Sequence, residues 1–132
     1  MRRIGLLLTL SVMTMGVLFA QKSPNAQFEK KIHDFGTVKE EIGAVTTSFE
    51  FVNTGDAPLV IQRVTATCGC TTPKYTREPI LPGDTGQVDV RYSTFRRPGN
   101  FRKNVRVYTN VPDSVFVLTV RGRVTPRERR VQ

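Results

Sequence analysis

The sequence predicts an all-β protein, an immunoglobulin-like β-sandwich of about seven strands. Apolar and polar residues alternate with the period of two that marks a strand with one buried face, and no segment sustains the period of an amphipathic helix. Clusters of turn-forming residues separate the alternating segments. The antibody version of this fold is excluded, because the chain has no tryptophan and its two cysteines are too close in sequence to join two sheets.

The N-terminus has the pattern of a secretory signal peptide. Met1-Arg2-Arg3 precedes an apolar run from Ile4 to Phe19, and the small residue Ala20 follows. A membrane anchor is the alternative, but three hydroxyl residues interrupt the run, which is shorter than the roughly 20 apolar residues of a span. We therefore predict cleavage of residues 1–20, no transmembrane segment afterwards, and a location in the periplasm or at the cell envelope.

After a polar lead-in over residues 21–26, the sandwich is expected to span residues 27–125. We predict strands over Phe28–His33, closed by a turn at Asp34–Gly36, then a short edge strand and turn over Val38–Gly43, then Val45–Val52, and then Leu59–Ala66. Phe49 and Phe51 should face inward. The segment Leu59–Ala66 is mostly apolar on both faces, which predicts a central position in its sheet.

The second half of the domain alternates more cleanly. Strands are predicted over Gln87–Ser93, Phe101–Thr109 and Val115–Val124. The residues expected to face the core are Val88, Val90, Tyr92, Phe101, Val105, Val107, Phe116, Leu118, Val120 and Val124. The loop from Pro79 to Asp84 is expected to plug one end of the core, and residues 126–132 form a basic tail.

The two cysteines, Cys68 and Cys70, are one residue apart, and export would place them in an oxidising compartment. A bond between them closes a very small ring, which stores strain, and Gly69 helps because it tolerates unusual backbone angles. Three interpretations stay open: an inert disulfide, a redox-active pair, or two thiolates that hold copper(I).

Candidate partners of these thiols are few. Arg63, Lys74 and Arg77 would lower a thiol pKa if they lay close to it. His33 is the single imidazole, and at the end of a predicted strand it is more often a polar surface residue than a ligand. We predict no metal site, no cofactor and no catalytic residues, because acids, bases and nucleophiles form no recognisable arrangement.

Basic residues outnumber acidic ones. Removal of Arg2 and Arg3 with the signal leaves 18 basic against 11 acidic residues, a net charge of +7. Five arginines occupy outward positions of three successive predicted strands, and paired strands would gather them into one basic face: Arg91, Arg102, Arg106, Arg121 and Arg123. This is either a solvated face or a docking face for an acidic polymer or protein.

Several segments, in the right order, resemble the domain-of-unknown-function 1573 family (DUF1573) of secreted bacterial proteins, which are common in Bacteroidetes. They are Ile32–Val38, Phe49–Ile61 with its Asn-Thr-Gly sequence, Cys68-Gly69-Cys70-Thr71, Leu81-Pro82-Gly83 and Arg97–Phe101. The resemblance implies an immunoglobulin-like sandwich similar to domains of cilia- and centrosome-associated proteins and of pilus chaperones. It implies no activity. Only the arginine-rich end, Arg127 to Arg130, departs from the family pattern.

The expected function is therefore that of a secreted, non-enzymatic module that binds or supports something at the cell envelope. Its partner would be an envelope protein or an anionic envelope component, and not nucleic acid. The alternative is a small periplasmic thiol redox or copper(I)-handling protein built around Cys68 and Cys70.

Overall fold

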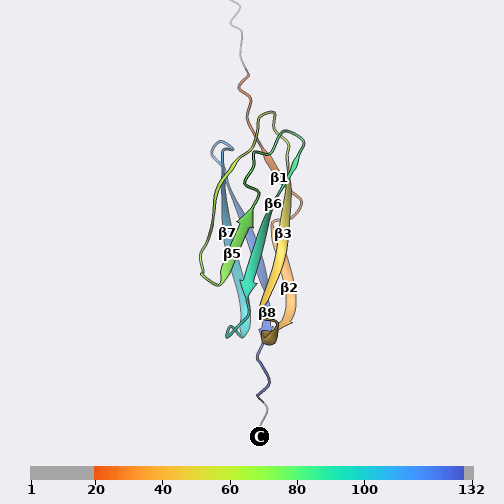
Figure 1. Ribbon diagram of the computed structural model, residues 1–132, viewed down its shortest axis with the longest axis vertical. Coiled ribbons are helices and arrows are strands. Elements are labelled where there is room, and N and C mark those ends of the chain that lie inside the picture. The colour runs from red at the N-terminus through yellow and green to blue at the C-terminus, as the bar shows by residue number, and fades with distance from the viewer. Residues whose placement is uncertain (1–19, 130–132) are drawn as a thin grey trace, which may run out of the picture.

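The computed structural model describes residues 20–129, and it is a sandwich of two four-stranded β-sheets (Figure 1). The prediction of an all-β sandwich is confirmed, with eight strands instead of about seven. The strands are β1 Ala26–Phe28, β2 Ile32–Lys39, β3 Ala44–Asn53, β4 Ile61–Ala66, β5 Thr71–Tyr75, β6 Thr85–Ser93, β7 Gly99–Thr109 and β8 Val115–Thr125. A short 3-10 turn, η1 Glu40–Ile42, joins β2 to β3.

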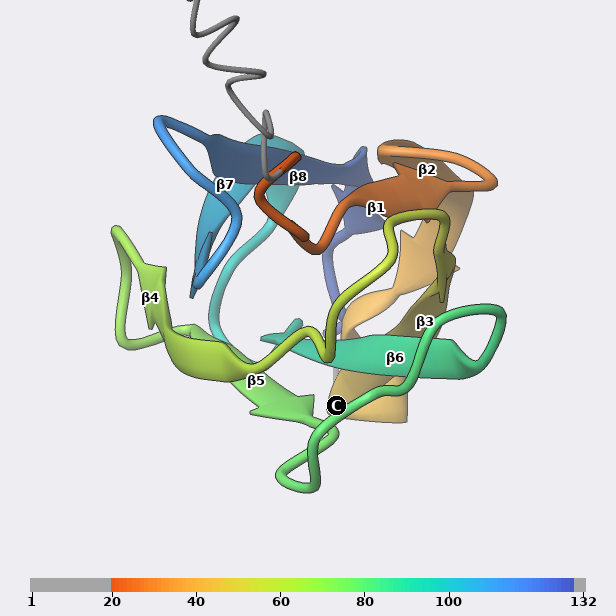
Figure 2. The ribbon, with the colours of Figure 1, turned by 90° about the horizontal axis from the view of Figure 1, so that it is seen from above.

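The first sheet has the strand order β1-β3-β6-β5, and the second has the order β2-β8-β7-β4. Every pair is antiparallel except β2 with β8, which is parallel. The chain changes sheets at five connections: between β1 and β2, β2 and β3, β3 and β4, β4 and β5, and β6 and β7. Figure 2 shows the two layers from above, with these crossings between them. The β1–β2 and β4–β5 crossings each join two edge strands, so each of them closes a side of the sandwich.

The core lies between the sheets and includes nearly all the residues that alternation predicted to face inward. Phe49 and Phe51 of β3 are 0% and 2% exposed. On β6, β7 and β8 all the predicted inward residues are buried except Phe116, which is half-buried. Tyr92 and Phe101 stack across the two sheets with ring centroids 3.9 Å apart. The alternation of apolar and polar residues was sufficient to predict the inward residues, because each of these strands has one solvent face and one core face.

The prediction of a single strand over Phe28–His33 was wrong. The predicted segment Phe28–His33 is divided between two sheets, since Glu29 donates to the carbonyl oxygen of Glu50 in the first sheet and Lys31 accepts from Thr119 in the second. Its alternation therefore does not come from one pleated surface. Nor does the chain stop at Asp34–Gly36: β2 continues to Lys39 through an irregularity between Asp34 and Thr37. Gly36 there has a φ of 68°, which favours glycine.

The segment Leu59–Ala66 was predicted to be central, but β4 is the edge strand of the second sheet. Its apolar character has another cause: Leu59 and Ile61 are buried at the end of the core, where Leu59 also pairs with Ile80 of the predicted plug loop. Ile80 does plug the core at 3% exposure, whereas Leu81 is 54% exposed.

Strand β5 was not predicted, because Pro73 suggested a break. β5 is an edge strand, where proline is tolerated because its missing N–H faces away from the sheet. Thr76 donates to Gln87, and Ser93 donates to the carbonyl oxygen of Cys70, so Pro73 lies at an alternate position whose backbone points outward.

Asn53 at the end of β3 joins three segments of the chain at one end of the sandwich. It is 0% exposed, and its Nδ2 donates to the carbonyl oxygens of Ala57 at 2.8 Å and Ile80 at 2.9 Å. Its Oδ1 accepts from the backbone N–H groups of Gly55 at 3.0 Å and Asn25 at 3.3 Å. The side chain thus uses both donors and both acceptor sites inside the protein.

The polar lead-in takes part in the same packing. Pro24 is buried, and the backbone of Ser23 and Asn25 accepts hydrogen bonds from the turn after Asn53. A Cβ on Gly55 would lie 2.3 Å from the carbonyl oxygen of Ser23, so the lead-in crosses this turn in close contact.

The predicted signal peptide falls almost wholly outside the described residues, as do the last three residues of the basic tail. Between residues 20 and 129, the structure has no helix long and apolar enough to cross a membrane.

Replacement of Asn53 by alanine is expected to lower the free energy of unfolding by about 2–4 kcal/mol, because it leaves several buried backbone groups without partners. Urea denaturation measures this loss. Asn100→Ala, which changes an exposed asparagine of β7, is the matched control and should change stability by at most about 0.5 kcal/mol. Equal effects of the two substitutions would contradict the role of Asn53.

Candidate functional site

Four of the five arginines predicted to form a basic face lie on the outer surface of the second sheet. Arg102 and Arg106 belong to β7, and Arg121 and Arg123 belong to β8. All four are exposed, and their neighbours in the strand sequence, such as Val105 and Val120, point into the core. We call these four residues the basic face.

Arg91 does not belong to this face, which corrects the prediction. It lies on β6 in the first sheet, where it pairs with Thr46 of β3 and Thr72 of β5. The prediction assumed that strands close in sequence are neighbours in one sheet. Here the chain changes sheets between β6 and β7, so Arg91 points away from the other four arginines.

The basic face contains a shallow hollow of about 390 Å³ near the start of β7. It is lined by Asp34, Gly36, Thr37, Asn100, Phe101, Arg102, Arg121, Gly122 and Arg123. The β2 irregularity forms one rim, because the turn at Gly36 brings its carbonyl oxygen close to Gly122: a Cβ on Gly122 would lie 2.9 Å from that oxygen. Three arginines and one carboxylate therefore surround one open depression.

Asp34 is the single acidic residue in the lining of this hollow. Its Oδ2 lies 3.1 Å from Nε of Arg121, and its Oδ1 accepts from the Gly36 N–H at 2.8 Å. The Gly36 hydrogen bond, with a contribution from Arg121, holds the pKa of Asp34 below its ordinary value. Asp34 is therefore ionised at neutral pH and offsets one of the three positive charges.

Arg102 and Arg121 are directly opposite each other on antiparallel strands. Like charges at such a position repel, so the pair destabilises the free protein slightly. An anion in the hollow would remove this repulsion and would find several guanidinium donors close together. Chemically, the hollow suits a phosphate, carboxylate or sulfate group.

Near the end of β7 and the start of β8, the outer surface of the same sheet carries exposed apolar side chains as well as arginines. Arg106 lies next to Val117, and Arg63 of β4 lies over the ring of Tyr108 at 4.1 Å. Val117 is 42% exposed, and Val115 and Ile32 on this surface are exposed to a similar degree. Sequence analysis missed these apolar residues, although Val115 and Val117 alternate with the inward Phe116 and Leu118 and so could have been placed outside.

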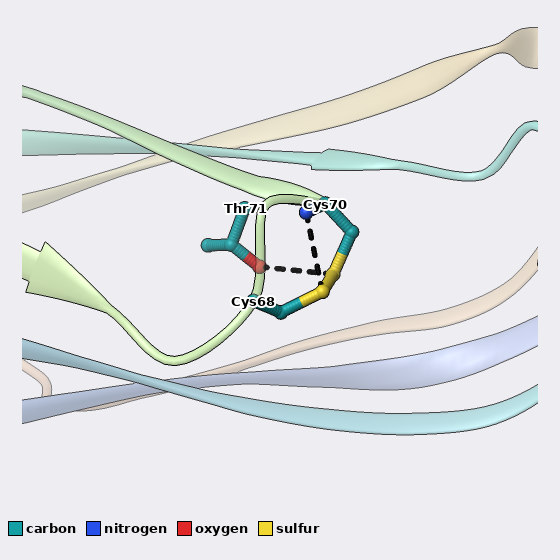
Figure 3. Close-up of a disulfide and its surroundings, with 3 residues drawn as sticks. All are labelled: Cys68, Cys70 and Thr71. Atoms are coloured by element: carbon teal, nitrogen blue, oxygen red, sulfur yellow. Dashed lines mark hydrogen bonds between the residues drawn. A yellow bond between two sulfur atoms is a disulfide. The ribbon is translucent and has the colours of Figure 1, made fainter.

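Cys68 and Cys70 form a disulfide in the turn that carries the chain from β4 to β5 (Figure 3). Their Cα atoms are 5.2 Å apart, and the Cys70 N–H donates to Sγ of Cys68 at 3.1 Å. Cys70 is 4% exposed and lies beside the hydroxyl of Thr71, while Cys68 is only half-buried. The two sulfurs therefore differ in their access to solvent.

Gly69 has no role in relieving backbone strain at this turn. Its φ is not positive, and a Cβ at this position would meet no atom within 4 Å. The expectation that Gly69 helps the ring by adopting unusual backbone angles is therefore wrong, and an alanine would fit in the same conformation.

The basic residues near the cysteines in sequence have other contacts. The guanidinium of Arg77 lies over the Tyr75 ring at 4.1 Å and donates to its hydroxyl, and Arg63 lies over Tyr108 as described above. Lys74 is exposed on β5 and pairs with Asp89. These contacts orient the two arginines toward tyrosines.

His33 is part of a small polar cluster at the edge of the second sheet. Nζ of Lys30 lies 2.9 Å from its Nδ1, and its ring packs edge-on against Phe35. Partial burial, with the charge of Lys30, lowers the pKa of His33 below its ordinary value. Residues 20–129 contain no group of three or more His, Cys, Asp or Glu side chains that could hold a metal ion.

Solved structures with the same fold are similar to this chain. A protein of unknown function from Porphyromonas gingivalis W83 is 16% identical with a TM-score of 0.67, over 83% of this chain and 51% of that one. The Vibrio cholerae VesB protease is 13% identical with a TM-score of 0.57, over 78% of this chain and 32% of that one. The YadV chaperone is 13% identical with a TM-score of 0.50, over 81% and 54%.

These likenesses establish the fold alone. The chain spans about half of the Porphyromonas protein and about a third of VesB. No curated protein matches the sequence. A family model does match: the model of the protein family of unknown function DUF1573 covers residues 26–124, from the first residue of β1 almost to the end of β8. The chain therefore belongs to the DUF1573 family.

Proposed function

We propose that this protein is a secreted, non-enzymatic, immunoglobulin-like binding module that holds an anionic component of the cell envelope against its basic face. The observation that carries the proposal is the hollow in which Arg102, Arg121 and Arg123 surround a single carboxylate, that of Asp34. Arg102 and Arg121 repel each other because they are directly opposite, and solubility alone does not require this arrangement.

The strand order supports the immunoglobulin-like part of the proposal. In immunoglobulin constant-type domains one sheet has the order ABED and the other contains C, F and G. Strands β1-β3-β6-β5 correspond to the first of these sheets and β4, β7 and β8 to the second. Strand β2 is then an additional edge strand beside β8.

The edges of the first sheet are poor places for a partner strand, which favours the second sheet as the binding surface. β1 has only three residues, and β5 carries Pro73 with its backbone pointing outward. Both features limit edge-to-edge pairing. The outer surface of the second sheet has no such restriction, and its positive charge matches the anionic polymers of a bacterial envelope.

Binding to a soluble polyanion tests the proposal. Inorganic polyphosphate should bind at 0.1 M salt and lose most of its affinity at 1 M, as the Debye length falls from about 10 Å to about 3 Å. Arg102→Thr should weaken binding about tenfold, since hydrogen bonds to charged groups are the stronger ones. The same variant should unfold at equal or higher urea, because one of two like charges is gone.

Arg91→Thr is the matched control, because it removes one exposed arginine from the opposite sheet and leaves the hollow intact. It should reduce polyphosphate affinity much less than Arg102→Thr. If both variants lose the same affinity, binding depends on net charge alone and the basic face is not a site. Isothermal titration calorimetry at both salt concentrations gives the comparison.

A thiol redox function is the second candidate, and the unequal access of the two sulfurs favours it. A thiolate of a dithiol partner would attack Sγ of the half-buried Cys68, the Cys68–Cys70 bond would break, and Cys70 would leave as a thiolate beside Thr71. The second thiol of the partner would then release Cys68. The partner dithiol is oxidised to a disulfide as Cys68 and Cys70 become two thiols.

The state of the cysteines is directly measurable. Alkylation of the exported protein without reductant should leave the intact mass unchanged, in a monomer, because both sulfurs are bonded within one chain. A Cys68→Ser, Cys70→Ser double variant should still fold and lose less than the roughly 3 kcal/mol expected for a 15-residue loop, since this ring is much smaller.

Two labels per chain, or a disulfide-linked dimer, would refute the internal bond. A reversible couple in glutathione buffers of the strength found in an oxidising compartment would favour the redox candidate. Sulfurs that stay bonded throughout that range would leave the binding module as the better account.

A further inference from the structure

The lower end of the sandwich in Figure 1 carries three segments that lie together. They are η1 (Glu40–Ile42), the β6–β7 loop (residues 95–98) and the chain after β8 (residues 126–129). Hydrogen bonds hold them in place: Glu40 Oε1 accepts from the Arg96 N–H at 3.0 Å, and its Oε2 accepts from the Arg127 N–H at 2.9 Å. We call these three segments the tip.

Two large apolar side chains project from the tip. Ile42 and Phe95 are each 58% exposed, the two highest values among the exposed large hydrophobic residues that the structure describes. They are close in space, because Ala44 pairs with Ser93 and the Thr94 N–H donates to the carbonyl oxygen of Gly43. Neither residue contributes to the core, so packing within the folded protein does not explain why large apolar side chains occupy these positions.

The loop conformation that exposes Phe95 is unusual. Arg96 has a φ of 57°, in the left-handed region that non-glycine residues rarely adopt. The Glu40 hydrogen bond and the turn from Thr94 to Arg97 fix the Arg96 backbone there. Its guanidinium lies 5.1 Å from the centre of the Phe95 ring. Glycine would fit this φ without strain, whereas an arginine adopts it at an energetic cost.

The tip continues into the hollow of the basic face. Asn100, in the lining of the hollow, is two residues after Pro98 of the tip, and Thr37 is three residues before Glu40. Over the tip and hollow together, seven arginines (Arg96, Arg97, Arg102, Arg121, Arg123, Arg127 and Arg129) stand against four acidic residues (Asp34, Glu40, Glu41 and Glu128), an excess of three positive charges.

We propose that the tip docks on an anionic lipid membrane, with Phe95 and Ile42 inserted at the level of the headgroups and the neighbouring arginines bound to lipid phosphates. This inference rests on the proposed function, since it identifies the anionic component as a lipid surface. Apolar side chains flanked by arginines are the combination that binds membrane interfaces, where apolar burial and charge attraction act together.

The shape of the tip favours a lipid surface over a protein groove. Ile42 and Phe95 belong to two separate segments at one end of an elongated molecule, with Glu41 next to Ile42 in the chain and Arg96 next to Phe95. A protein partner would need a matching cavity for each side chain. A bilayer interface accepts both from the same direction and places the arginine side chains at the height of the phosphates.

A tryptophan reporter tests insertion directly, because the natural chain contains no tryptophan. In the exported, processed protein, Phe95→Trp should show a blue-shifted emission with phosphatidylglycerol vesicles, and brominated lipids should quench it. Pure phosphatidylcholine vesicles should give much smaller changes, since charge attraction is lost. Leu81→Trp is the matched control: Leu81 is 54% exposed in a loop at the opposite end, so its emission should stay unchanged.

Phe95→Ser separates this inference from the proposed function. It should weaken binding to phosphatidylglycerol vesicles about tenfold, the loss expected when a phenylalanine no longer leaves water, and should leave polyphosphate binding intact. Leu81→Ser should change neither. Sedimentation with vesicles and titration with polyphosphate measure the two affinities.

Three other results would contradict the membrane inference, and one of them would also contradict the proposed function. If Phe95→Ser binds vesicles as tightly as the natural protein, the tip does not insert and the inference is wrong. If the natural protein binds polyphosphate but not vesicles, the inference is wrong and the proposed function stands. If it binds neither, both are wrong.

Discussion

The buried amide of Asn53 is the interaction on which one whole end of this sandwich depends. It joins the lead-in, the turn after β3 and the loop before β6 through bonds to Asn25, Gly55, Ala57 and Ile80. None of these residues lies within a strand, and the isolated pairing of Leu59 with Ile80 is the one ladder-like contact among these segments in the part of the chain that the structure describes. A polar side chain with two donors and two acceptor sites replaces the missing ladder bonds, and Ile80 can then close the core.

The opposite end is built in another way. There the carboxylate of Glu40 holds the β6–β7 loop and the chain after β8 by their backbone N–H groups, and the apolar residues Ile42 and Phe95 remain in solvent. One end of the molecule therefore buries Ile80 and exposes Leu81, whereas the other exposes both Ile42 and Phe95. Among the described residues, the two most exposed large apolar side chains therefore lie at the end that adjoins the arginine hollow.

The change of sheet between β6 and β7 decides the electrostatics. Because β7 and β8 pair in the second sheet, Arg102 and Arg121 are direct neighbours, while Arg91 is on the other side of the core. Four arginines are thus collected on one surface, where Asp34 compensates only part of their charge. Repulsion among these arginines lowers the stability of the fold, and burial of apolar core residues such as Phe49 and Val105 offsets that loss.

The sequence by itself determined the sandwich, the core faces of β3, β6, β7 and β8 and the outward direction of the arginines, because a half-buried strand imposes a period of two on its residues. It could not determine where the chain changes sheets, since crossings at Glu29–Lys31 and after Ala66 leave no periodic signal. For the same reason it misjudged β4 and Arg91. Only the tertiary structure placed Asp34 beside Arg121 and brought the segments of Ile42 and Phe95 together, because those pairings join segments that are distant in sequence and lack any shared pattern.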